Sequence, residues 1–327
     1  MAVTARRIAE ELGLSQSTVS RILNGDRRQR IAAGTRARVE ETARRLGYQP
    51  NAVARSLRTG RTHIVGLYTT HRYDARNDFL AEILGGLQHA CARNRLDLLL
   101  HIGGLEQGPD GVFNGLRNGR VDGLFLHTSP DDPLVARLSA SALPVVALAD
   151  PLPQLSSVTC DDRSGMVQVV DYLWQQGYRR FAFVAPAATL ASVERRVTAW
   201  NEALRVHGMD CEHDVIRITG EDAGAALDRL DSNNDAPCAV SCWNDRTAYN
   251  LLRACMERGI AVPDQIAVTG FDGFLDDKLP ARRLVTVQCP WTEVAVTAVD
   301  LLLRLIQDEE IERETCLPVR LLSGDTA

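Results

Sequence analysis

Short apolar segments separated by amphipathic helical patterns constrain the fold of this chain more than any other feature. Strands that are apolar on nearly every residue must be covered on both faces, which is typical of parallel sheets flanked by helices. The apolar segments are too many for a single regular sheet. We therefore expect an α/β body of two doubly wound parallel-sheet lobes with a cleft between them. The expected strands are residues 63–68, 96–102, 121–127, 144–149, 179–185, 214–219, 238–243 and 265–271, and the helices include 79–93, 165–176, 192–207, 245–258 and 292–307.

Three short helical patterns precede this body. The first ends at Gly13, the second begins at the cap Ser15 and ends at Asn24-Gly25, and the third begins at the cap Thr35 and ends at Gly47. Helix, short turn and helix is an arrangement that binds DNA, with the second helix in the major groove. We therefore expect a small all-α helix-turn-helix domain at this end of the chain.

The charge distribution supports this interpretation. Residues 1–61 hold 13 arginines against 5 acidic residues, whereas the whole chain has a net charge of −5. A basic segment on an acidic body suggests a head that binds a polyanion. A structural three-helix bundle with a solvated polar face is the alternative. The side chains expected to contact bases and phosphates are Ser15, Gln16, Ser17, Thr18 and Arg21.

The segments "VTARRIAEELGLSQSTVSRILNG" and "TRARVEETARRLGYQPNAVARSLRTGRT" resemble the LacI/GalR family of bacterial transcription regulators. The resemblance continues more loosely over nearly the whole chain. It implies a headpiece at 1–49, a hinge helix and linker at 50–61, and an effector-binding and dimerisation domain at 62–327. It also adds Asn24 to the DNA-binding candidates. The link at residues 26–34 is longer than in the family and rich in arginine, either for phosphate contacts or merely as a longer loop.

In the family, residues like 51–58 form a helix only on operator DNA, paired with the same helix of a second subunit. The residue that matches Leu57 then enters the minor groove and bends the duplex. A segment of eight residues is too short to be a stable helix alone, which agrees with this behaviour. The alternative is that Leu57 packs as an ordinary linker residue. The other hinge residues expected to bind DNA are Asn51, Ala54, Arg55 and Arg58.

In open α/β sheets, ligands bind beyond the carboxyl ends of the strands. By resemblance, Arg196, Asn244 and Asp272 hold effector hydroxyls, and Phe79 and Trp291 flank the ligand; Asp162, at an expected lobe crossover, is a further candidate. The alternatives are helix or turn caps for the Asn and Asp residues, a solvated Arg196 and a core Trp291. The family body resembles periplasmic sugar-binding proteins, so the implied effector is a sugar or sugar derivative, with a purine or nucleoside as the alternative.

Several classes of protein find no support in the sequence. It has no G-x-x-x-x-G-K-[ST] phosphate loop, G-x-S-x-G elbow or H-E-x-x-H motif, and its 7 histidines are scattered. We therefore expect neither catalysis, a metal nor a cofactor; a sugar-modifying enzyme with a DNA-binding head is the remaining alternative. The 8 cysteines are expected to be reduced thiols, and no apolar run is long enough to span a membrane.

Location and assembly complete the expectations. The amino terminus is too charged for the core of a signal peptide, so we expect a protein of the bacterial cytoplasm. No leucine heptad follows "CLPVRLLSGDTA", which favours a homodimer over a tetramer. The implied protein is a repressor that binds double-stranded operator DNA as a dimer, and an effector that moves the lobes changes the order of the paired hinge helices.

Overall fold

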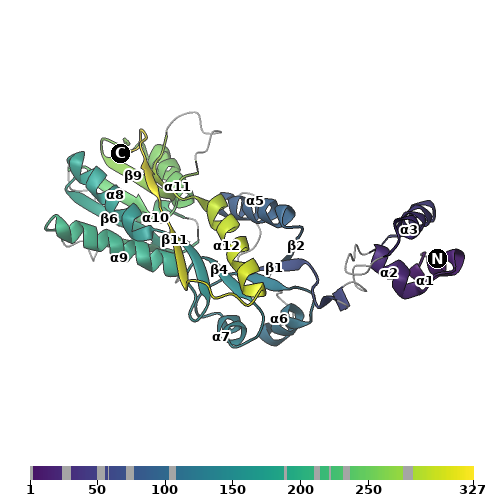
Figure 1. Cartoon of the computed structure of the whole chain (residues 1–327). Coiled ribbons are helices and arrows are strands. Elements are labelled where there is room, and N and C mark those ends of the chain that lie inside the picture. Colours follow the sequence, from purple (N-terminus) through teal and green to yellow (C-terminus); the bar gives the residue numbers. More distant parts are fainter. Residues whose placement is uncertain are drawn as a thin grey trace. The chain divides into compact units, whose positions relative to one another are not determined.

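The computed structural model describes residues 3–23, 31–49, 56–57, 59–70, 77–102, 108–187, 190–209, 214–220, 222–230, 236–274 and 283–327. The chain divides into two compact units, Met1–His63 and Ile64–Ala327 (Figure 1). Among the described residues, no helix has both the length and the apolar character that crossing a membrane requires. The cysteines within the described ranges are free thiols, and all except Cys316 are buried.

The first unit contains a small helical head. Its helices are α1 (Ala5–Leu12), α2 (Gln16–Leu23) and α3 (Ala33–Arg45). Gly13 ends α1 in the left-handed conformation, with φ 65°, and Ser15 Oγ accepts a hydrogen bond of 3.1 Å from Thr18 N at the start of α2. The apolar residues of the three patterns meet in one core: Ile8, Ala9, Val19, Ile22, Val39 and Ala43.

One predicted helix start in the head is wrong. Helix α3 begins at Ala33 rather than after Thr35, and Arg36 N donates to the carbonyl of Ala32. Ala32 offers no capping side chain, so a prediction based on cap residues misses this start. The predicted end of α2 at Asn24-Gly25 lies outside the described residues.

The amino-terminal lobe of the second unit is a parallel sheet covered on both faces. Its strand order is β11-β5-β4-β3-β1-β2, and every pairing is parallel. The strands are β1 (Ile64–Thr69), β2 (Asp97–Ile102), β3 (Gly123–His127), β4 (Val145–Ala149), β5 (Ser156–Cys160) and β11 (Glu314–Leu317). Helices α5 (Asp78–Arg93) and α12 (Trp291–Ile306) pack with Phe125, whereas α6 (Gly108–Arg117) and α7 (Pro133–Ser139) pack with Leu124 and Leu126 on the other face.

The carboxyl-terminal lobe repeats this plan. Its strand order is β12-β10-β9-β8-β6-β7, and only the pairing of β10 with β12 is antiparallel among the described strands. The strands are β6 (Arg180–Pro186), β7 (Val215–Ile218), β8 (Cys238–Cys242), β9 (Ile266–Asp272), β10 (Val285–Gln288) and β12 (Arg320–Leu322). Helices α8 (Asp162–Gln175) and α9 (Ala191–Val206) cover one face, and α10 (Gly224–Leu227) and α11 (Asp245–Glu257) cover the other.

The chain crosses between the lobes three times. The first two crossings follow β5 and β10, as expected near residues 160 and 290. The third lies between β11 and β12, inside the segment "CLPVRLL" rather than before it. The second crossing, after β10, brings the chain back to the amino-terminal lobe, where α12 lies beside α5 (Figure 1). There Thr292 Oγ1 donates a 2.6 Å hydrogen bond to Glu82 Oε2. The prediction of two doubly wound parallel-sheet lobes is confirmed.

Candidate functional site

A cavity of about 120 Å³ lies where the carboxyl ends of strands from both lobes meet. His127 ends β3, Ala149 ends β4 and Asp272 ends β9, so the cavity occupies the position at which open α/β sheets bind ligands. A wider hollow of about 340 Å³ adjoins it and shares Phe79, Asn244 and Asp272 with it. The lining residues of the cavity are Asn77, Phe79, His127, Ala149, Asp150, Leu190, Ser192, Arg196, Trp243, Asn244, Asp272 and Trp291.

Arg196 is the cationic centre of the cavity wall. Its side chain is 3% exposed, so the solvated alternative is wrong. Its Nε donates a 2.8 Å hydrogen bond to Asp162 Oδ1, its Nη1 donates a 2.5 Å bond to the carbonyl of Trp243, and its Cζ lies 3.7 Å from the centre of the Phe271 ring. Burial opposes the charge, but Asp162 and then Asp272 hold the pKa of Arg196 above its ordinary value. The guanidinium is therefore charged and fixed in direction.

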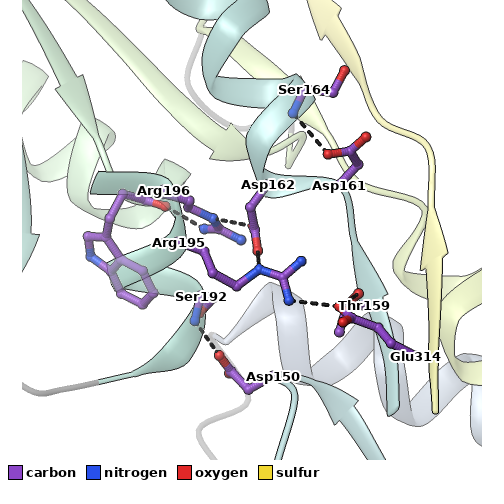
Figure 2. A network of polar contacts seen from close by, with 10 residues as sticks. Asp150, Thr159, Asp161, Asp162, Ser164, Ser192, Arg195, Arg196 and Glu314 are labelled. Carbon is purple, nitrogen blue, oxygen red and sulfur yellow. Dashed lines mark hydrogen bonds and ion pairs between the residues drawn. The ribbon is translucent and has the colours of Figure 1, made fainter. Parts of the chain in front are cut away.

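Asp162 supports Arg196 from behind (Figure 2). Its carboxylate is 3% exposed and is shared between Arg196 and Arg195, whose Nε lies 3.3 Å from Oδ2. The ordinary helix cap is Asp161 instead, which accepts a 2.9 Å hydrogen bond from Ser164 N. Burial raises the pKa of Asp162 in spite of the two arginines. Asp162 is not among the described residues that line the cavity, so its place differs from the predicted ligand contact.

Asp272 lines the cavity next to Arg196. It is 7% exposed, and Arg196 Nη1 lies 3.9 Å from its Oδ1, which is too long for a hydrogen bond. Burial raises the pKa of Asp272 well above its ordinary value, because Arg196 only partly compensates. Its φ of 136° is rare for a residue other than glycine, and such strain concentrates at functional sites. The carboxylate thus has capacity to accept hydrogen bonds from a ligand.

Asn244 and Asp245 differ in role although they are adjacent. Asn244 lines the cavity and also caps α11, since its Oδ1 accepts a 2.9 Å hydrogen bond from Thr247 N. The capping alternative is therefore correct for this oxygen. Asp245 is buried; its carboxylate accepts hydrogen bonds from Thr286 Oγ1 and from Phe274 N. Burial raises the pKa of Asp245 to about 7 although both hydrogen bonds oppose this.

Aromatic rings also line the cavity. Phe79 lies edge-to-face with Trp291, with ring centroids 4.8 Å apart, and 5.1 Å from the centroid of His127. Trp291 is 4% exposed, so it is a core residue and a cavity residue at once. These rings offer an apolar surface in the same cavity as Arg196 and Asp272, which suits the apolar face of a ring-shaped ligand. Trp200, by contrast, is fully buried and packs in the core.

The structure adds cavity residues that the sequence analysis did not select. Asp150 Oδ1 accepts a 2.6 Å hydrogen bond from Ser192 N, and its Oδ2 lies 3.9 Å from His127 Nε2. Asp150 directly follows the strand predicted at 144–149, and Trp243 ends the one at 238–243. The position of a polar or aromatic residue at the end of a strand is the sequence signal that indicates both residues.

The head presents its predicted DNA-binding residues to different degrees. Ser15, Gln16 and Ser17 are exposed, and Thr18 and Arg21 are half-buried. Ser15 also serves as the cap of α2, with its Oγ 2.8 Å from Thr18 Oγ1. The residues Asn24, Asn51, Ala54, Arg55 and Arg58 lie outside the described residues.

Leu57 is the hinge candidate that the structure describes. It is helical together with Ser56 and Thr59, and its side chain is 83% exposed. An apolar side chain of this size gains little while it stays in water. The minor-groove role of Leu57 and the alternative of an ordinary linker residue both stay predictions.

Comparison with known proteins places both units. Residues 4–51 match the family described as bacterial regulatory proteins, lacI family, and residues 170–327 match the periplasmic binding protein-like domain. The probable HTH-type transcriptional repressor ExuR of Bacillus subtilis (strain 168) is 28% identical over 324 residues, covering 96% of this chain and 95% of that protein.

Solved structures agree in fold. A lac repressor dimer bound to operator and the anti-inducer ONPF is 22% identical with a TM-score of 0.85, covering 100% of this chain and 99% of that one. A complex of the transcriptional regulator CelR with cellobiose is 25% identical with a TM-score of 0.72, covering 99% of this chain and 100% of that one. The chain thus joins a lacI-family helix-turn-helix head to a periplasmic binding protein-like body, and it is similar over nearly its whole length to LacI-family transcription regulators.

Proposed function

We propose that this regulator is a repressor whose affinity for operator DNA is set by a sugar or sugar derivative bound in the cavity between the lobes. The observation that carries the proposal is the convergence of Arg196 and Asp272 on a small cavity with an aromatic wall. The charged guanidinium of Arg196 and the carboxyl group of Asp272, within reach of one ring, can hold neighbouring hydroxyls, while Phe79 and Trp291 cover the apolar face.

Several features support a sugar as the effector. The carboxylate of Asp272 can accept two hydroxyl donors, and Arg196 is already oriented by Asp162 and Trp243, so its position costs little on binding. Asn244 adds an amide at the same wall. The similar regulator CelR was solved with cellobiose, which is a disaccharide.

The DNA-binding part of the proposal rests on the head and hinge. Two heads of a homodimer contact half-sites through Gln16, Ser17 and their neighbours, and the arginines contact phosphates. The hinge helices pair on DNA, and Leu57 enters the minor groove between them. We place the boundaries at 1–49, 50–61 and 62–327, assign the chain no catalytic role and locate its action in the bacterial cytoplasm, where operator DNA is found.

The test is calorimetric titration of the purified full chain with a panel of mono- and disaccharides and polyols. At least one sugar should bind the wild type, and Asp272→Asn should lose that binding because the amide accepts fewer hydroxyl donors. The matched control is Asp110→Asn, whose carboxylate is 90% exposed on α6. If Asp272→Asn binds the same sugar as tightly as the wild type, the assignment of the cavity is wrong.

A purine or nucleoside is the second candidate. The aromatic side chains Phe79, Trp243 and Trp291 all line the cavity and could pack against a planar base, whose N–H groups could donate to Asp272. Including adenine, hypoxanthine and adenosine in the same titration separates the two classes. Binding of a base without binding of any sugar favours this second candidate.

A further inference from the structure

The cavity arginine is connected to the opposite lobe by a second arginine next to it in sequence. Arg195 and Arg196 are consecutive on α9 of the carboxyl-terminal lobe, and both contact the carboxylate of Asp162 (Figure 2). Arg195 Nη1 also donates a 2.8 Å hydrogen bond to Glu314 Oε1. Glu314 begins β11, which is the edge strand of the amino-terminal sheet, so this ion pair joins the two lobes.

Glu314 is held in place on its own lobe. Its Oε1 also accepts a 2.9 Å hydrogen bond from Thr159 Oγ1 on the neighbouring strand β5. The hydrogen bond from Arg195 holds the pKa of Glu314 below its ordinary value, so the glutamate is ionised at neutral pH. The side chains of Arg195 and Glu314 are 33% and 41% exposed, so the pair can break and form again without opening the core.

A second interlobe contact lies at the start of the same helix. Ser192 N donates a 2.6 Å hydrogen bond to Asp150 Oδ1, and Asp150 directly follows β4 of the amino-terminal lobe. Both partners line the cavity. Helix α9 therefore touches the opposite lobe at two places, Ser192 and Arg195, and the next residue is Arg196, which lines the cavity.

We propose that Arg195, Asp162 and Glu314 form an interlobe bridge that fixes the relative position of the lobes and, through the shared Asp162 carboxylate, the position of Arg196. A movement of the lobes that separates Arg195 from Glu314 leaves Arg195 with Asp162 alone. It then competes more strongly with Arg196 for that carboxylate. Arg195 and Glu314 are positioning residues: they act on a ligand only through Arg196 and the lobe arrangement.

A bridge of this kind can control the equilibrium between two arrangements of the lobes, although it contributes little to the stability of the whole protein. Partly exposed ion pairs contribute little to the stability of a whole protein. Two lobe arrangements that differ only slightly in free energy are nevertheless shifted measurably by a small term that acts on one of them. The coupling to a ligand rests on the proposed function, whereas the bridge between the lobes does not.

The first experiment is amide hydrogen exchange by mass spectrometry on the full chain, as the wild type and as Arg195→Gln, Glu314→Gln and the double variant. Exchange in the peptide that holds the Ser192 amide should rise about two- to five-fold in each single variant, the range expected for one such pair. The double variant should match Arg195→Gln, because Arg195 is the interlobe partner that the described residues provide for Glu314. Arg195→Lys should be intermediate, since a lysine can pair with only one of the two carboxylates.

The matched control is Arg304→Gln, which removes a similarly exposed ion pair between Arg304 and Glu309. This pair lies at the end of α12 and does not join the two lobes. Its exchange at the Ser192 peptide should equal that of the wild type. Urea unfolding midpoints should remain similar in all variants. Unchanged exchange in Glu314→Gln, or additive effects in the double variant, would overturn the bridge.

The second experiment tests the coupling to the cavity with D-glucose, D-galactose and cellobiose as probes. Whichever sugar binds the wild type should bind Glu314→Gln about two- to five-fold more weakly and Arg304→Gln equally well. Equal binding by Glu314→Gln and the wild type refutes the coupling to Arg196. If none of the three binds the wild type, the choice of effector fails, and the exchange data still decide whether the bridge exists.

Discussion

At the residue scale, the site depends on side chains that hold one another in position. Arg196 lies over the ring of Phe271, and Phe271 lies against Gly165 on α8. A Cβ at Gly165 would come within 2.6 Å of Phe271 Cε2, so this glycine permits the close approach of helix and strand. The position of the cavity arginine is therefore determined in part by the absence of a side chain on another element.

Gly165→Ala is expected to disturb this stack. Overpacking typically costs about 1–3 kcal/mol and exceeds the gain of about 1 kcal/mol from a better helix former. The variant should unfold at lower urea than the wild type and bind a sugar ligand more weakly. In contrast, Gly85→Ala on α5 should be stabilising, because a Cβ there meets nothing within 4 Å. A Gly165→Ala protein at least as stable as Gly85→Ala would contradict this packing.

The buried Asp245 predicts a dependence of stability on pH. Its pKa in the folded state is about 7, above the ordinary value of 3.8, because burial disfavours the charge. Between these two values the folded state holds more protons than the unfolded state, so the contribution of Asp245 to stability falls as pH rises. The free energy of unfolding in urea should fall less from pH 5 to pH 7.5 in Asp245→Asn than in the wild type. An identical loss in both proteins would show that Asp245 is not the titrating group.

At the scale of elements, strands that form a continuous apolar run were predicted, and several strands without such a run were missed. The strands β1, β3 and β4 are buried almost throughout and were all expected. The edge strand β11 exposes alternate residues, β12 has only three residues and begins with an exposed arginine, and β5 reads "SSVTC", so none of them carries a continuous apolar signal. Tertiary pairing decides such strands, which sequence patterns alone do not reveal.

The candidate site was predictable to a similar extent. Asp272 and Asn244 follow predicted strands. They were predicted from the rule that ligands bind beyond the carboxyl ends of strands, together with the family resemblance. Asp162 was found, but its role was not, because the sequence does not show that its carboxylate lies behind Arg196. The interlobe pair of Arg195 with Glu314 joins residues far apart in the chain, so no local pattern could indicate it.

The hinge segment gives a prediction at the element scale. Leu57→Ala should weaken binding to operator DNA by about 10-fold or more, because the smaller side chain cannot hold a base step open. Binding to random DNA should change little, since phosphate contacts dominate there. Competition assays with labelled operator and unlabelled random duplexes measure both. An equal loss on both kinds of DNA would refute the minor-groove role of Leu57.

At the scale of the whole molecule, the charges are divided between two tasks. The first 61 residues hold 13 arginines, whereas the chain as a whole has a net charge of −5. Contacts with phosphates release counterions and therefore weaken with salt, whereas a ligand in a buried cavity is screened much less. DNA binding and ligand binding should thus respond differently to ionic strength.

Operator affinity is expected to fall about 10³-fold or more between 50 and 200 mM salt if two heads together neutralise about six phosphates. The affinity for a neutral sugar should change less than about two-fold over the same range. Fluorescence anisotropy with labelled duplex and calorimetry with sugar provide the two curves. Operator binding that does not vary with salt would contradict contacts between the arginines and phosphates.

The central claim is that a ligand between the lobes controls the DNA affinity of the head. Its most direct test is the anisotropy of a labelled duplex, selected from a random pool by the full chain, titrated with protein in the presence and absence of each compound of the panel. The account predicts that at least one sugar changes the DNA affinity of the wild type, and that Asp272→Asn binds the duplex normally but no longer responds. An Asp272→Asn protein that responds like the wild type, or a wild type that responds to no compound, would contradict it.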